Sequence, residues 1–131
     1  MIALLLRTCY HESMKKLTFT YYDWEKFATF LDSLPAKDAQ KLVQLIREIE
    51  QYGLQTSERQ EWVKKLENNL YEIRSRQGSN IQRVIYFQID QSQYMITHGF
   101  TKKTQKTPIK EINRGIRLRN TYFHERRNGH E

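Results

Sequence analysis

The chain has 131 residues and a formal net charge of +7 at pH 7. This length favours a single domain with a real hydrophobic core. No apolar run approaches the ~20 residues of a membrane span, and the single cysteine, Cys9, excludes an internal disulfide and a cysteine-rich metal site. A reducing cytoplasm is therefore the expected compartment.

Positive charge is concentrated in the second half of the chain. Residues 1–69 hold 10 Lys or Arg and 10 Asp or Glu, whereas residues 70–131 hold 12 and 5. Such asymmetry indicates an anionic partner for the basic half. Composition alone leaves a nucleic acid, a membrane surface, an acidic protein segment and a merely solvated basic surface as alternatives.

The first half begins with a segment that fits no later element. We expect residues 1–13 to be an N-terminal extension outside a single core domain, residues 14–123. Residues 17–22 are β-branched and aromatic, which predicts a strand. Asp23 is expected to cap a helix with apolar residues at helical spacing up to Leu34.

A second helix is predicted over residues 35–52, with a proline in its first turn and Gly53 as its C-terminal stop. The polar residues 54–60 are expected to form a loop, and residues 61–66 a short helical turn. The apolar faces of the two long helices need a sheet to cover them.

Three runs rich in Ile, Val, Tyr and Phe follow, separated by clusters of turn-forming residues. They predict an antiparallel meander with strands at residues 70–76, 81–90 and 94–100. The meander is followed by a basic loop at residues 102–107.

The last predicted helix covers residues 108–123, with Ile109, Ile112 and Ile116 facing inward, and ends in a frayed polar tail, residues 124–131. The order β-α-α-β-β-β-α predicts a small α+β domain with an antiparallel-rich sheet packed against the N-terminal helical hairpin. The first strand is expected to pair inside this sheet, beside a later strand.

Several stretches keep the order and approximate spacing of a known group of proteins. They are FLDSLP (residues 30–35), VKKLENNLYEIR (63–74), QRVIYF (82–87), HGFTKKTQKTP (98–108) and EINRGIRLRNTYF (111–123). Together they resemble the RelE/ParE superfamily of bacterial toxins, and most closely its phage-derived HigB-like branch. The resemblance covers residues 13–123.

The resemblance implies a cytoplasmic toxin of a type II toxin–antitoxin pair that binds the ribosomal A site and cuts mRNA there. This reaction needs no metal and no other cofactor. The implied partners are the ribosome, mRNA and a cognate antitoxin, often a helix-turn-helix protein that binds operator DNA together with the toxin. No membrane partner is implied.

Arginines are the first candidates for the site. Arg83 lies in a largely apolar strand, where a charge is costly unless it is paired or used. By resemblance it takes the place of the mid-strand arginine that contacts the scissile phosphate; its alternative role is a salt bridge with Glu72. Arg74 and Arg76 share one face of their strand, either as RNA contacts or as solvated cations.

Lysines of the basic loop are the next candidates. The equivalent loop of the family is basic and faces the active cleft, which implies catalytic roles for Lys102 and Lys103 and an RNA contact for Lys106. A lysine near several arginines can have a lowered pKa and transfer protons. A lysine pair in a loop is otherwise a solvated surface.

His98, Tyr122 and His124 are the candidates for proton transfer or RNA contact. Imidazole titrates near neutrality, and several relatives place a catalytic Tyr or His near the C-terminus. We assign His98 and Tyr122 to catalysis and His124 to RNA binding. The structural alternatives are a hydrogen-bonded His98 at a strand end and a Tyr122 that packs on the sheet or stacks on a base.

Two other functions share the same fold. One is a ParE-like toxin that blocks DNA gyrase by binding, without catalysis, and the other is a degenerate toxin that only binds its antitoxin. Fold cannot decide between them. The row of cations, His98 and the lysine loop favour the nuclease.

Overall fold

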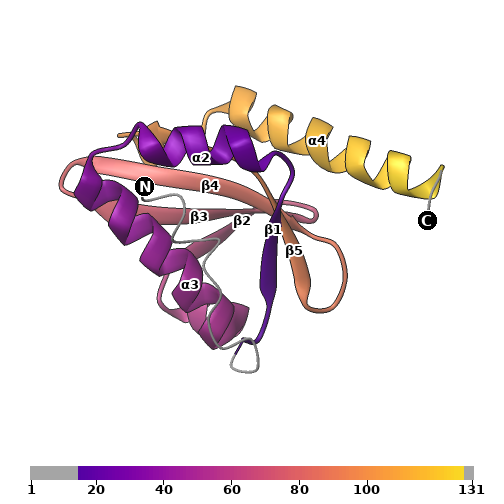
Figure 1. Ribbon diagram of the computed structural model, residues 1–131, viewed down its shortest axis with the longest axis horizontal. Coiled ribbons are helices and arrows are strands. Elements are labelled where there is room, and N and C mark those ends of the chain that lie inside the picture. The colour runs from indigo at the N-terminus through magenta and orange to yellow at the C-terminus, as the bar shows by residue number, and fades with distance from the viewer. Residues whose placement is uncertain (1–14, 129–131) are drawn as a thin grey trace.

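A computed structural model describes residues 15–128. Within that span, one sheet and three helices form the fold (Figure 1). In chain order they are β1 (Thr18–Tyr21), α2 (Trp24–Asp32), α3 (Ala36–Arg59), β2 (Val63–Glu67), β3 (Leu70–Gln77), β4 (Asn80–Gln88), β5 (Gln93–Lys102) and α4 (Ile109–Arg127). The predicted α+β class is confirmed. The expected extension, residues 1–13, lies outside the described residues.

The sheet has five strands in the order β1-β5-β4-β3-β2. Strands β2 to β5 are antiparallel neighbours, and β1 is parallel to β5. The predicted meander is confirmed, and so is the pairing of the first strand with a later one. The first strand lies at an edge, however, because β5 is the last strand of the meander and offers only its outer edge to β1.

Helix α3 is longer than predicted, because residues 54–59 continue it rather than form a loop. Gly53 does interrupt the helical geometry, with φ 87° and ψ 173°, a conformation that favours glycine. The chain resumes the helix beyond this kink, and Ser57, fully buried, donates a hydrogen bond to the Gly53 carbonyl at 2.7 Å. Leu54 also packs against the core there.

Strand β2 replaces the short helical turn that was predicted for residues 61–66. The backbone turns at Glu61, which has a positive φ of 63°. Val63 then pairs with Ile73 of β3 and is buried. Pairing with an existing strand outweighs the local helical spacing of the apolar residues, which is a weak signal over so short a run.

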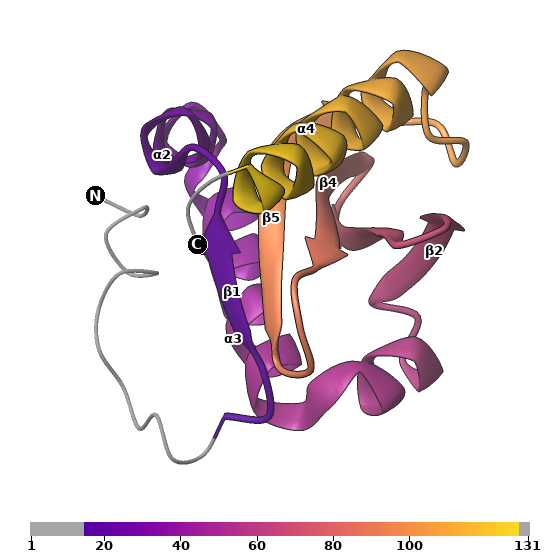
Figure 2. The same cartoon turned by 90° about the vertical axis from the view of Figure 1, so that its right-hand side faces the viewer.

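The helices lie in two layers, one on each face of the sheet (Figure 2). The hairpin of α2 and α3 covers one face and builds the larger core, with Leu42 and Ile46 of α3 packed in the same cluster as Val84 and Tyr86 of β4. Helix α4 covers the other face. The smaller cluster there contains Leu70, Ile85, Phe87, Ile112, Ile116, Tyr122 and Phe123.

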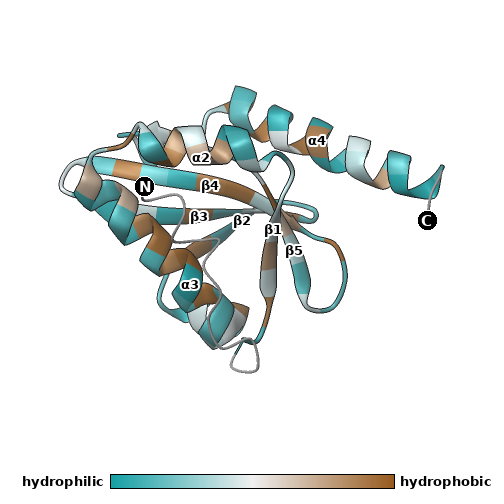
Figure 3. Cartoon of the chain, in the orientation of Figure 1, coloured by the Kyte–Doolittle hydropathy of each residue, from teal (hydrophilic) through white to brown (hydrophobic). Residues whose placement is uncertain are grey.

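Helix α4 is much more polar than α3, as Figure 3 shows by its largely hydrophilic colouring. The prediction that Ile112 and Ile116 face inward is confirmed. The same prediction is wrong for Ile109, which is 62% exposed because it is the first residue of the helix, where the chain has just left the basic loop. The helix runs on to Arg127, past its expected end at Phe123. Among residues 15–128, no helix is long and apolar enough to cross a membrane.

We predict that Gly99→Ala destabilises the fold by about 2 kcal/mol, the usual size of an overpacking effect. A Cβ at Gly99 of β5 would lie 2.5 Å from Cε2 of Phe30 on α2, so either the ring or the helix must move. The free energy of unfolding from urea denaturation measures the effect. In a Phe30→Ala background the same change should cost much less, and an equal cost in both backgrounds would contradict the contact.

Candidate functional site

Three arginines converge on one face of the sheet, near the end of the meander. Arg74 and Arg76 belong to β3, and Arg83 lies on β4 directly opposite Arg74. Side chains alternate along a strand, so Arg74 and Arg76 share a face, as predicted. Hydrogen bonds from all three guanidinium groups reach Gln105, so we call these three residues the arginine cluster.

Arg83 is the buried member of the arginine cluster, with no exposed side-chain surface. Its Nη1 donates to the backbone oxygen of Gln105 at 3.1 Å and to Oγ1 of Thr107 at 3.2 Å. Its Nε and Nη2 are also buried but find no acceptor among residues 15–128. Burial lowers the pKa of Arg83; Glu72 opposes this shift, and Arg74 and Arg76 add to it.

Glu72 of β3 is the carboxylate that holds this group of cations together. It is fully buried and accepts from Nε of Arg74 at 2.6 Å and from the hydroxyl of Thr107 at 2.8 Å. Nη1 of Arg83 lies 3.8 Å from Oε2 of Glu72, the oxygen that also accepts from Thr107, whereas Arg74 contacts Oε1. The salt bridge that was the alternative role of Arg83 is therefore present. One carboxylate does not neutralise three guanidinium groups, however, so the site keeps an excess of positive charge.

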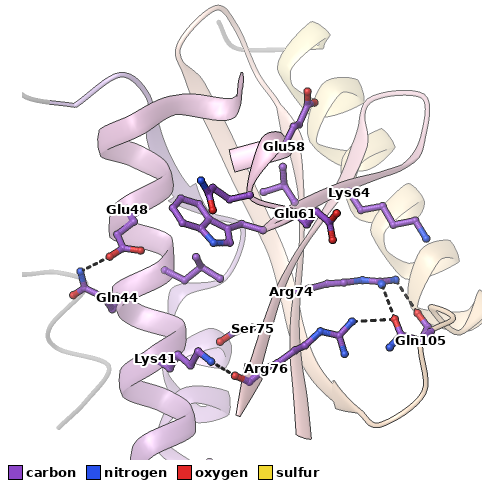
Figure 4. A pocket seen from close by; sticks show the side chains of 14 residues that line it. Lys41, Gln44, Glu48, Glu58, Glu61, Lys64, Arg74, Ser75, Arg76 and Gln105 are labelled. Carbon is purple, nitrogen blue, oxygen red and sulfur yellow. Dashed lines mark hydrogen bonds between the residues drawn. The ribbon is translucent and has the colours of Figure 1, made fainter. Parts of the chain in front are cut away.

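Gln105, in the loop between β5 and α4, supplies oxygens to the whole arginine cluster. Figure 4 shows its bonds with Arg74 and Arg76. Its backbone oxygen accepts from Nη2 of Arg74 at 2.8 Å as well as from Arg83. Its side-chain Oε1 accepts from Nη2 of Arg76 at 3.0 Å. Sequence reasoning missed Gln105 and Thr107, because neither residue type signals a site and only the path of the loop brings them to the arginines.

A cavity of about 750 Å³ opens beside the arginine cluster. Arg74, Arg76 and Gln105 line one side, and α3 and β2 form the other (Figure 4). Nζ of Lys41 on α3 donates to the backbone oxygen of Arg76. The cavity also has an aromatic wall, Trp62, and carboxylates such as Glu48, so it is mixed in charge away from the arginines.

The three predicted lysines lie around the same loop. Lys102 is the last residue of β5, next to Ile81 of β4, and Lys103 and Lys106 flank the turn that carries Gln105. All three are exposed. The lysines thus lie in, or directly before, the loop that carries Gln105, and we call them the rim lysines.

His98 makes its hydrogen bonds with residues outside the arginine cluster. Its Nδ1 lies 2.8 Å from the hydroxyl of Thr97, and its Nε2 lies 3.1 Å from Oε1 of Glu111 on α4. It lines a separate cavity of about 180 Å³ between α2, β5 and α4. The structural alternative for His98, a hydrogen-bonded histidine, is the arrangement that these contacts describe.

The charge state of His98 follows from these surroundings. Burial, helped by nearby Arg114 and Arg117, lowers the pKa of His98 to about 3. The imidazole is therefore neutral near pH 7. A neutral imidazole can donate from Nε2 to Glu111, while the Thr97 hydroxyl that lies next to Nδ1 donates to the backbone oxygen of Ile85 at 3.1 Å.

Tyr122 and His124 lie away from the arginine cluster. Tyr122 packs on Phe87, with ring centroids 5.7 Å apart. Phe87 is four residues along β4 from Arg83, about 13 Å of strand. His124 is exposed in the last turn of α4, with its Nε2 3.1 Å from Nδ2 of Asn128. Among residues 15–128, no group of three or more His, Cys, Asp or Glu side chains is arranged to hold a metal ion.

Comparison with known proteins identifies a family for most of the chain. Residues 29–120 match the family model described as Phage derived protein Gp49-like (DUF891). No curated protein matches the chain. The matched segment contains the arginine cluster, Glu72 and Gln105. The chain therefore belongs to the phage-derived Gp49-like family, which is associated with RelE-like toxins.

Proposed function

We propose that this protein is the toxin of a type II toxin–antitoxin pair and that it cleaves mRNA on the ribosome. The family supports the toxin class, and the arginine cluster supports an RNA phosphate as the group that the protein acts on. The proposal includes a HigB-like antitoxin with a helix-turn-helix fold, binding to operator DNA only through that antitoxin, and action in the cytoplasm.

The observation that carries the proposal is the pair of unpaired donors on Arg83. Both Nε and Nη2 are buried and lack acceptors among the described residues, and a buried donor without a partner costs roughly 1–3 kcal/mol. A phosphate oxygen would satisfy them, and the planar guanidinium suits two parallel bonds to phosphate. Because Gln105 and Thr107 already lie against Arg83, the loop must shift for a phosphate to enter.

The chemistry that suits such a site is an internal transfer within RNA. The 2′-oxygen forms a bond to the adjacent phosphorus, and the bond from phosphorus to the 5′-oxygen breaks. The 2′-hydroxyl loses a proton and the 5′-oxygen gains one, which leaves a 2′,3′-cyclic phosphate and a 5′-hydroxyl. Fixed cations in a water-poor site stabilise the negative charge that develops on the phosphoryl oxygens, which is the role we give to Arg83, Arg74 and Arg76.

The surroundings of the arginine cluster bear on the proton transfers. Glu72 already accepts from Arg74 and Thr107, while His98 and Tyr122 make their contacts elsewhere. We therefore give the rim lysines, Lys102, Lys103 and Lys106, the role of holding RNA and shuttling protons. We infer that the ribosome aligns the 2′-hydroxyl for attack, which restricts cleavage to translated mRNA.

Expression of this protein without an antitoxin tests the proposed function. We expect growth arrest, with mRNA cut within translated codons and 2′,3′-cyclic phosphate ends, measured by mapping RNA ends in the cell. An mRNA that cannot be translated should stay whole. Intact mRNA with accumulating DNA damage would point to gyrase instead, and harmless expression of folded protein would point to a degenerate toxin.

Arg83→Met should separate catalysis from folding. We expect cleavage to fall by about 10²–10³-fold, the usual loss when one preorganised donor to a developing charge is removed. The fold should survive, because Glu72 keeps its ion pair with Arg74 and its hydrogen bond from Thr107, and because the change also removes two buried donors that have no acceptor among the described residues. Rates on translated mRNA and thermal unfolding measure the two effects. As a charge-matched control, Arg59→Met at the exposed end of α3 should change neither; undiminished cleavage by Arg83→Met would remove Arg83 from the mechanism.

Glu72→Gln should destabilise the protein by about 3 kcal/mol, because it leaves neighbouring guanidinium groups without their buried counter-charge. In an Arg83→Met background, the same change should cost clearly less, since one of the repelling cations is gone. Urea denaturation of the single and double variants measures this coupling. Costs that simply add would show that Glu72 and Arg83 do not interact.

A further inference from the structure

The outward face of α4 carries a second, separate set of cations. Positions three or four apart lie on the same side of a helix, and one such row of α4 is exposed throughout. We call it the α4 stripe: Lys110, Asn113, Arg117, Asn120, His124 and Arg127. Every member is a cation, a histidine or an amide.

The acidic residues of α4 do not neutralise this row. Glu111 turns inward and contacts His98 at 3.1 Å, so it is occupied beside the sheet. Glu125 is exposed in the last turn of α4, but it does not belong to the stripe. Arg119, by contrast, points to the sheet and binds Glu67 at 3.1 Å. The helix thus pairs its inner charges within the fold and leaves its outer cations facing solvent.

The length of the α4 stripe also suits an extended partner. At about 1.5 Å per residue, the stripe from Lys110 to Arg127 spans roughly 26 Å. The last turns of α4 project past the edge of the sheet (Figure 1). The helix begins directly after the loop that carries Gln105, so one end of the stripe adjoins the arginine cluster.

We propose that the α4 stripe docks on an RNA double helix beside the cleaved strand. This inference rests on the proposed function, because it takes RNA as the target. An A-form duplex presents phosphates and 2′-hydroxyls across a wide, shallow minor groove. Lys110, Arg117 and Arg127 bind the phosphates, and Asn113 donates to and accepts from the 2′-hydroxyls. Asn120, whose Oδ1 already accepts from Arg119, only donates to them. A duplex along α4 leads its single-stranded continuation to Arg83.

The docking proposal is tested by binding of the full chain to a blunt RNA duplex. The duplex has about 20 base pairs, a little more than a double-stranded-RNA domain covers. Fluorescence anisotropy at several salt concentrations compares the wild type with the triple variant Lys110→Gln, Arg117→Gln, Arg127→Gln. We expect at least tenfold weaker binding, and a salt slope smaller by about 2–3, since each lost phosphate contact removes just under one.

A matched control changes three exposed cations on the opposite side of the sheet or at its far edge: Lys37→Gln, Arg59→Gln, Lys65→Gln. It should keep wild-type affinity and slope, and a DNA duplex of the same sequence should bind the wild type more weakly. Equal losses in both triple variants, no duplex binding by the wild type, or DNA binding as tight as RNA binding would each overturn the inference.

The two proposals fail in different assays. Duplex binding is measured without cleavage, so it judges the α4 stripe alone. Cleavage of translated mRNA by the wild type and by Arg83→Met judges the nuclease. Loss of duplex binding in the α4 variant, together with an absence of cleavage by the wild type, would reject the nuclease and keep the docking surface.

Discussion

The site depends on one buried carboxylate. Glu72 has no exposed side-chain surface and lies between Arg74 and Arg83, with the hydroxyl of Thr107 as a third partner. Without it, guanidinium groups on neighbouring strands would repel one another in a place where water cannot screen them. With it, two cations are fixed on a rigid sheet, and the net charge of the group stays positive. The positive charge of the group favours an anion, and Glu72 holds the arginines in place without one.

The two faces of the sheet differ in what they carry: one carries the main apolar core, and the other carries the charged group. The α2–α3 hairpin covers one face with an apolar core, which supplies most of the burial. The other face has a small apolar cluster under α4 and, beyond it, the charged group. Because side chains alternate along β3 and β4, the same strands can serve both layers. Substitutions at Arg83 therefore act on a different layer from substitutions at Val84.

Period-two alternation was enough to predict that Arg74 and Arg76 share a face, and the apolar strand around Arg83 was enough to single it out. The pattern could not reveal Gln105 or Thr107, because their contacts depend on how the loop after β5 folds back. It was wrong about β2, where helical spacing over a few residues lost to pairing with β3. It also took Gly53 for the end of α3, because the pattern does not distinguish a glycine at a helix end from a glycine at a kink within a helix.

The position of Gln105 means that any anion that binds the arginines must compete with the oxygens of Gln105. Its oxygens are tethered next to the arginines, so they compete at a high effective concentration. A free inorganic phosphate or mononucleotide, which binds only at this one point, must displace these oxygens at its ordinary cellular concentration. A polymer that is already bound at other points also has a high effective concentration at the site, so it competes better. Under the proposed function, the loop oxygens would therefore shield the arginines from small phosphate metabolites and favour a long polyanion such as RNA.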